Sequence, residues 1–150
     1  MTVIPPLVKE VVVGCPVPQA FAEFTAGVRQ WWPLATHSVG GAESPDLVLD
    51  EHGFVETLPD GTPSRWGDVL TWEPPSRLAM TWHPGQDPDP HTRIEVTFED
   101  APGGTLVRLV HSGWENLGLP GVESLGDYDE GWNVVLGGYV ERLASAGQPR

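Results

Sequence analysis

Few polar residues in this chain have a type and position suited to chemistry, and His111 is the first of them. It ends the run Thr105–His111, in which alternation places it on the same side as Val107 and Leu109. An imidazole on an apolar, inward face can orient a ligand or move a proton near neutral pH. The alternative is a structural histidine satisfied by hydrogen bonds, and the sequence does not fix whether Glu115 lies near it.

Asp68 is the second candidate. Alternation along the run Trp66–Glu73 places it on the same side as both tryptophans of that run, which predicts an inward position. A carboxylate that points inward must be paired or neutralised, so it could act as an acid or base with a perturbed pKa. Arg65 and Arg77 are the available partners. An exposed carboxylate at an edge or bulge is the alternative.

A third group of residues could bind a metal, because His83 and His91 flank a loop that contains Asp87 and Asp89. Proline-rich loops with scattered acids usually bind nothing, so we expect no metal and no cofactor. The sequence also lacks the common catalytic motifs of serine hydrolases, P-loop proteins, dinucleotide-binding enzymes, zinc proteases and dithiol oxidoreductases. No catalytic residue is therefore assigned beyond the two weak candidates above.

The elements that must position these residues begin with a β-branched run, Leu7–Val13, which predicts the first strand. Pro18 and the apolar spacing after it predict a helix that continues to Trp31 and ends before Pro33. The segment Leu34–Pro45 has no periodicity and contains two adjacent glycines, so we expect a surface loop or a short lid.

Six further strands are expected between Asp46 and Gly113, because short apolar runs alternate there with turn residues. An antiparallel meander is the natural arrangement. The expected strands are Asp46–Asp50, Phe54–Leu58, Trp66–Glu73, Leu78–Trp82, Arg93–Glu99 and Thr105–His111.

The last stretch, Leu125–Ala146, changes its apolar period from 2 to 3.6 and predicts an amphipathic helix. Gly137 and Gly138 in its middle each cost about 1 kcal/mol relative to alanine, so we expect another segment to pack closely there. The apolar stripe of this helix consists of Trp132, Val135, Leu136, Tyr139, Val140 and Leu143.

Composition limits the class of protein. A chain of 150 residues predicts one domain, residues 1–150 with a core of about 7–143. The net charge of −13 argues against nucleic acid as a partner. The sequence contains no signal-peptide pattern, and none of its apolar stretches approaches the length of roughly 18 residues that a membrane span needs. We therefore expect no membrane insertion and a cytoplasmic location. The single cysteine, Cys15, is expected to be a small buried hydrophobe.

The expected elements follow the order strand, helix, six strands and a long final helix, which Trp132 opens. This order resembles the helix-grip fold of the START and birch-pollen-allergen (SRPBCC) superfamily. Several motifs more narrowly resemble bacterial homologues of the C-terminal domain of the heat-shock protein 90 ATPase activator. These motifs are Pro18-Gln-Ala-Phe-Ala-Glu-Phe, Trp31-Trp32-Pro33, Trp66-Gly67-Asp68-Val69, Trp72-Glu73-Pro74-Pro75, Leu78-Ala79-Met80-Thr81-Trp82, His111-Ser112-Gly113-Trp114 and Gly131-Trp132-Asn133-Val134-Val135-Leu136.

The resemblance implies an α+β fold. A curved antiparallel sheet of about six to seven strands would wrap around the long C-terminal helix, with one or two short helices after the first strand and a cavity between sheet and helix. The seven tryptophans fit this expectation, since large rings suit both a core and a pocket for a flat apolar molecule.

We therefore predict that a small hydrophobic or aromatic molecule binds in this cavity. There are two alternatives. One is an aromatase-like or cyclase-like enzyme that uses the same cavity, and the other is a protein that contacts a heat-shock chaperone. The sequence leaves open whether the protein forms a homodimer. The residues expected to contact the ligand are Trp31, Trp32, Trp66, Trp82, His111, Trp114, Trp132, Leu136 and Tyr139.

Overall fold

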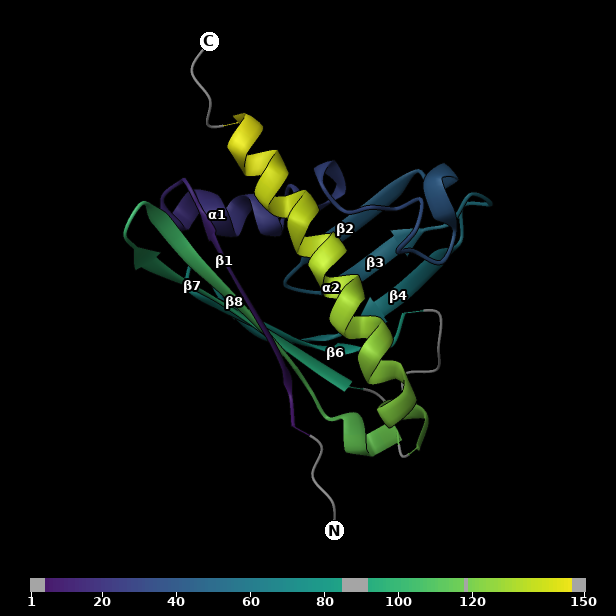
Figure 1. Ribbon diagram of the computed structural model, residues 1–150. Coiled ribbons are helices and arrows are strands. Elements are labelled where there is room, and N and C mark those ends of the chain that lie inside the picture. The colour runs from purple at the N-terminus through teal and green to yellow at the C-terminus, as the bar shows by residue number, and fades with distance from the viewer. Residues whose placement is uncertain (1–4, 85–91, 118, 147–150) are drawn as a thin grey trace.

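The computed structural model describes residues 5–84, 92–117 and 119–146, and the side chains of residues 5–84, 92–115 and 127–144. Two antiparallel sheets are covered by a long C-terminal helix, α2 (Leu119–Ala146), which runs across them (Figure 1). This arrangement confirms the α+β, helix-grip class expected from the sequence.

The larger sheet has the strand order β1-β8-β7-β6-β5, so the first strand of the chain pairs with the last. In this register His111 lies between Leu7 and Ile94. The inward side of β7 and β8 is buried up to His111, as alternation predicts. The strands are β1 (Leu7–Val13), β5 (Val69–Glu73), β6 (Arg77–Trp82), β7 (Thr92–Ala101) and β8 (Gly104–Ser112).

The smaller sheet has the order β2-β3-β4, and four short helical segments complete the described elements other than α2. The helix predicted to reach Trp31 ends at Phe24, because Thr25 leaves the helical conformation and its hydroxyl donates to the Phe21 carbonyl at 2.8 Å. The elements are β2 (Asp46–Asp50), β3 (Gly53–Thr57), β4 (Pro63–Gly67), α1 (Val17–Phe24), η1 (Val28–Gln30), η2 (Gly41–Glu43) and η3 (Trp114–Leu117).

The predicted single strand Trp66–Glu73 is wrong, because the chain bends at Asp68 and its two halves join different sheets. The described residues thus form eight strands, seven of them after β1. Gly67 permits the bend, since a Cβ there would lie 1.9 Å from the carbonyl oxygen of Thr81. The bend turns Asp68 outward, and Leu70, expected inside, is 55% exposed. Trp72 still packs against the core as predicted, since the register shifts between Val69 and Thr71.

Helix α2 begins at Leu119, six residues before the predicted start at Leu125, so Trp132 lies inside the helix and does not open it. Gly121 interrupts the apolar pattern in this first part, which hides the start of the helix from an argument based on periodicity. The predicted stripe from Trp132 to Leu143 is buried or half-buried and faces the core. Tyr139 in this stripe also donates its hydroxyl to the Ala20 carbonyl at 2.7 Å.

Alanine at the two adjacent glycines of α2 is expected to have opposite effects. The Cβ position of Gly137 has nothing within 4 Å. Gly137→Ala should therefore stabilise the fold by about 0.5–1 kcal/mol. A Cβ at Gly138 would lie 2.7 Å from the Trp31 carbonyl oxygen, so Gly138→Ala should destabilise it by about 1–3 kcal/mol. Chemical denaturation measures both, and equal shifts in one direction would contradict this packing.

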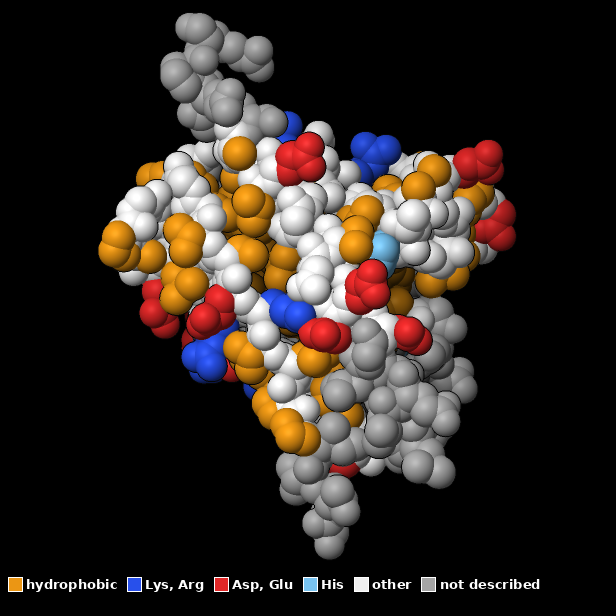
Figure 2. All heavy atoms as spheres, viewed as in Figure 1, with side chains coloured by type: hydrophobic (Ala, Val, Ile, Leu, Met, Phe, Trp, Pro, Cys, Tyr) orange, Lys and Arg blue, Asp and Glu red, His pale blue; other side chains and the backbone are white. Residues whose placement is uncertain are grey.

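Cys15 is buried, and burial followed by the negative charge of Glu23 raises the pKa of its thiol, as suits a packing residue. On the face shown in Figure 2, acidic side chains are spread over the surface and basic ones are few, which agrees with the acidic composition.

Candidate functional site

A cavity of about 360 Å³ lies where the segment 36–39 meets α2 and the ends of β4 and β6. Its wall is apolar on the sheet side and mixed on the side of the loop and helix. It is lined by Trp32, Thr36, His37, Ser38, Val39, Trp66, Trp82, Pro84, Asp127, Tyr128, Gly131, Trp132 and Val135.

Four tryptophans from four segments form the apolar side of this cavity. The rings of Trp32 and Trp66 lie 5.2 Å apart between centroids. Those of Trp82 and Trp132 lie 5.3 Å apart. Trp66 and Trp82, at 5.8 Å, join the two pairs. We call these four rings the tryptophan wall; their spacings are typical of aromatic packing.

The segment 36–39 forms the rim opposite α2. The Thr36 hydroxyl and His37 Nδ1 are 2.6 Å apart, and the His37 carbonyl oxygen accepts the indole N–H of Trp32 at 2.7 Å. Across the cavity, a Cβ added to Gly131 would lie 3.7 Å from His37 Nε2. His37 and Gly131 therefore face each other at the mouth, although the sequence assigned neither a role in binding.

Glu56 of β3 holds the rim to the smaller sheet. Its side chain is fully buried. Its Oε1 accepts hydrogen bonds from the Val39 amide at 2.9 Å and from the Trp66 indole at 3.1 Å. Its Oε2 accepts from the Gly40 amide at 2.9 Å and from the Ser44 hydroxyl. One carboxylate thus connects the rim to the tryptophan wall.

The charge of Glu56 is maintained by these four donors. Burial by itself would raise the pKa of the carboxyl, but the hydrogen bonds outweigh burial and the pKa is lowered. No sequence motif predicted a role for this residue. The signal that could have found it is alternation in the run Phe54–Leu58, which places Glu56 on the same side as the apolar Phe54.

His111 is fully buried behind the tryptophan wall, as its predicted inward position requires. Its Nδ1 lies 3.0 Å from the Trp132 indole nitrogen. Because an indole N–H can only donate, Nδ1 is the acceptor and the ring proton sits on Nε2. Nε2–H then donates to the Thr92 hydroxyl at 2.6 Å, which donates to the Trp82 carbonyl at 3.3 Å.

This hydrogen-bond chain defines the role of His111. Burial lowers its pKa from the ordinary 6.5 to about 3, so the ring is neutral near pH 7. A second ring proton would point Nδ1–H at the N–H of Trp132, and two donors cannot bond to each other. His111 therefore holds Trp132 in place as a structural histidine, which was the alternative expected from the sequence.

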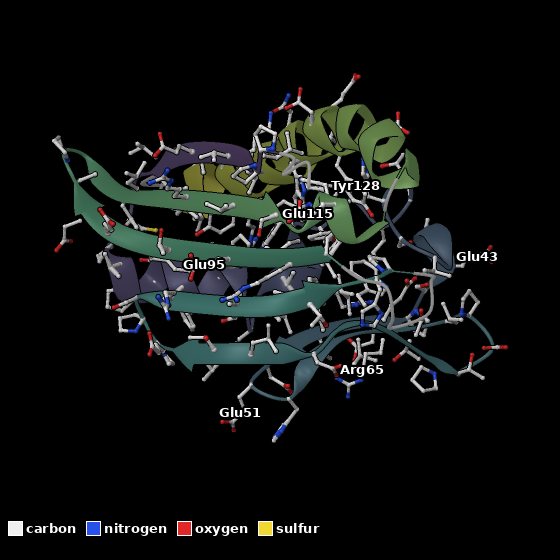
Figure 3. The ribbon with its side chains drawn as sticks, turned by 90° about the horizontal axis from the view of Figure 1, so that it is seen from below. Glu43, Glu51, Arg65, Glu95, Glu115 and Tyr128 are labelled. Carbon is white, nitrogen blue, oxygen red and sulfur yellow. The ribbon has the colours of Figure 1, made fainter. Side chains whose placement is uncertain are left out.

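The inward position predicted for Asp68 is wrong. Its side chain is 57% exposed and pairs with Arg65 at 3.0 Å, because the bend after Gly67 turns it outward. Figure 3 shows Arg65 on the side of the sheets away from α2. Glu115, which the sequence left undetermined relative to His111, is exposed. Neither carboxylate belongs to the cavity wall that the described residues form.

The nine predicted ligand contacts separate into two groups. Trp32, Trp66, Trp82 and Trp132 line the cavity. The others are buried behind it, and their contact with a ligand stays a prediction; these are Trp31, His111, Trp114, Leu136 and Tyr139.

Of the group considered for a metal, His83 is buried. His91, Asp87 and Asp89 lie outside the described residues. In the part of the chain that the structure describes, no group of three His, Cys, Asp or Glu side chains is placed to hold a metal ion. Over the same residues, no helix is long and apolar enough to cross a membrane.

The fold and the cavity together define a helix-grip protein with a pocket of ligand size. The family model described as activator of Hsp90 ATPase homolog 1-like protein matches residues 15–144, so the chain belongs to this family. None of the curated proteins matches the chain.

Several solved structures are similar over nearly the whole chain. CalC from Micromonospora echinospora, described as a self-sacrificing resistance protein, has a TM-score of 0.73 and 23% identity, covering 97% of this chain and 98% of its own. The Aha1 dimer from Colwellia psychrerythraea has a TM-score of 0.66 and 15% identity, covering 93% and 96%. Because their identities are low, these two structures support a shared fold with this chain and nothing about its function. The anthrahydroquino-gamma-pyrone synthase Txn09, complexed with SUM, has a TM-score of 0.59 and 28% identity, covering 93% and 97%.

Proposed function

We propose that this protein binds a small, flat hydrophobic or aromatic molecule against the tryptophan wall, beneath the rim 36–39. The observation that carries the proposal is the cavity of about 360 Å³ next to four packed indole rings. Protein interiors normally close such a space by packing, and ligand pockets commonly have about 300–1,000 Å³.

Charge favours an uncharged ligand. The chain carries a net charge of −13, and Asp127 lies on the cavity wall. An anion entering beside this carboxylate would be repelled, because opposing like charges are unfavourable in a partly desolvated site. A flat neutral ring system that stacks on indole is therefore the ligand class that fits the wall.

Gly131→Leu is expected to block the cavity and weaken binding of fluorene, a flat neutral hydrocarbon, at least about tenfold. The glycine lines the cavity, and an added Cβ meets only the His37 ring at van der Waals distance. A leucine side chain would therefore extend into the binding space while the backbone stays in place. Equilibrium dialysis measures the affinity.

Gly137→Leu is the matched control, because it makes the same substitution at an exposed position of the same helix. It should bind fluorene as the unmodified protein does. Equal loss of affinity in both variants would place binding outside this cavity. An unmodified protein that binds neither fluorene nor its ketone, 9-fluorenone, would remove the proposal.

Catalysis in the same cavity is the second candidate, and the likeness to the synthase Txn09 at 28% identity favours it. Since neither His111 nor Asp68 faces the cavity, an acid or base would have to come from the wall, where His37, Asp127 and Tyr128 lie. Mass spectrometry of a bound aromatic compound after prolonged incubation separates the two functions. A carrier returns the compound unchanged, whereas an enzyme returns a product.

A chaperone contact is the third candidate, carried by the name of the matched family. A pull-down with the cognate heat-shock chaperone tests it, and no recovery at micromolar protein would count against it. We also keep as proposals a single domain over residues 1–150, a cytoplasmic location and a homodimer, the last because one similar structure is described as a dimer.

A further inference from the structure

The indole N–H of Trp82 differs from those of the other three tryptophans in the wall. Trp82 is 5% exposed, and its Nε1 is buried without a hydrogen-bond acceptor among the residues described. The other three each donate to a protein acceptor: Trp32 to the His37 carbonyl oxygen, Trp66 to Glu56 Oε1 and Trp132 to His111 Nδ1. Buried donors in folded proteins are almost always paired, so this one calls for an explanation.

A second polar group stands beside this donor. Tyr128 lines the cavity together with Trp82. Burial raises the pKa of the Tyr128 hydroxyl, and the Trp82 indole N–H partly offsets that rise, because it points toward the hydroxyl oxygen. The contact does not reach hydrogen-bond geometry, so the Trp82 donor stays unsatisfied. The hydroxyl is therefore protonated near neutral pH and can donate. Figure 3 shows Tyr128 on α2, at the end of the molecule that also carries Glu43.

We propose that the bound molecule carries a neutral oxygen acceptor, such as the carbonyl of an aryl ketone or a quinone, which accepts hydrogen bonds from the Trp82 indole and the Tyr128 hydroxyl. This inference rests on the proposed function and specifies its ligand. The flat rings would pack on the tryptophan wall while the oxygen satisfies the unpaired donor.

Two further observations narrow the ligand class. A carboxylate would also accept these hydrogen bonds, but Asp127 on the wall and the net charge of −13 oppose an anion. The Trp82 nitrogen is shielded from solvent, so neighbouring side chains, Tyr128 among them, have to shift to admit the oxygen. A hydrocarbon of the same shape would leave the donor unpaired, and sites built to form a hydrogen bond reject analogues that lack the partner.

The test compares 9-fluorenone with fluorene, which differ only in a carbonyl in place of a methylene. Equilibrium dialysis should show the unmodified protein binding 9-fluorenone about tenfold more tightly. In Trp82→Phe, which removes the N–H, the ratio of the two affinities should fall to about one. Tyr128→Phe, which removes only a hydroxyl, should lower the ratio in part. Gly137→Leu should keep the full ratio.

An NMR measurement on the unmodified protein makes the test independent of how well the variants fold. The seven tryptophans give indole N–H signals. Both ligands shift the Trp82 signal by ring current, and the hydrogen bond should place it further downfield with 9-fluorenone than with fluorene. Equal affinities for the two compounds, or a ratio unchanged in Trp82→Phe, would overturn the inference while leaving the pocket intact. If neither compound binds, the proposed function fails and this inference fails with it.

Discussion

Replacing Glu56 by alanine is expected to lower the free energy of unfolding by about 3–4 kcal/mol, the largest effect that we expect from one substitution. The carboxylate is fully buried and accepts four hydrogen bonds, from two backbone amides, a hydroxyl and an indole. Its loss leaves these donors unpaired and opens a gap between the rim and the smaller sheet. Urea denaturation measures the change.

Two variants serve as controls for Glu56→Ala. Glu51→Ala makes the same substitution at an exposed glutamate in the turn before β3, labelled in Figure 3; it should change stability by no more than about 0.5 kcal/mol. Ser44→Ala removes a single donor and should cost about 1 kcal/mol. If Glu56→Ala is no more damaging than Ser44→Ala, the carboxylate does not hold the rim.

The second large effect that we expect is a loss of stability on acidification, caused by protonation of His111 in the unfolded state. The folded protein binds a proton on this ring only near pH 3, whereas an unfolded histidine binds one near its ordinary pKa of 6.5. Between these values the unfolded state carries the extra proton, so stability is fully present above about pH 6.5 and falls as the pH decreases. From about pH 7.5 to about pH 4.5 the loss from this residue should be about 3 kcal/mol.

His111→Gln isolates this contribution, because the glutamine amide can accept from Trp132 and donate to Thr92 but does not titrate. Stability should be measured by urea denaturation of both proteins at the two pH values. The carboxylates titrate in both, so their effect cancels in the difference. The unmodified protein should lose about 3 kcal/mol more than the variant; equal losses would mean that His111 is not a buried neutral group.

Local periodicity predicted the parts of the fold that depend on a single element. Alternation in β7 and β8 placed His111 inside, and the helical stripe from Trp132 to Leu143 is buried as expected. It failed for Asp68, because a close approach of Gly67 to the Thr81 carbonyl, remote in sequence, bends the chain and turns Asp68 outward.

The candidate site was harder to predict than the fold. The cavity forms where the rim meets α2, and no local pattern shows that His37 faces Gly131 across it. Alternation predicts that Glu56 points inward. Its structural role, however, depends on hydrogen-bond donors that lie 12 to 17 residues away in the chain or in another strand. The unpaired N–H of Trp82 becomes visible only when the partners of the other indoles are known.

The most direct test of the central claim, that a small apolar molecule occupies the cavity, is native mass spectrometry of the protein purified under mild conditions from its own host. We expect a small molecule that leaves on denaturation, is retained by Gly137→Leu and is absent from Gly131→Leu. A molecule retained equally by Gly131→Leu would place binding elsewhere. An unmodified protein that carries no molecule and takes up neither fluorene nor 9-fluorenone would contradict the claim.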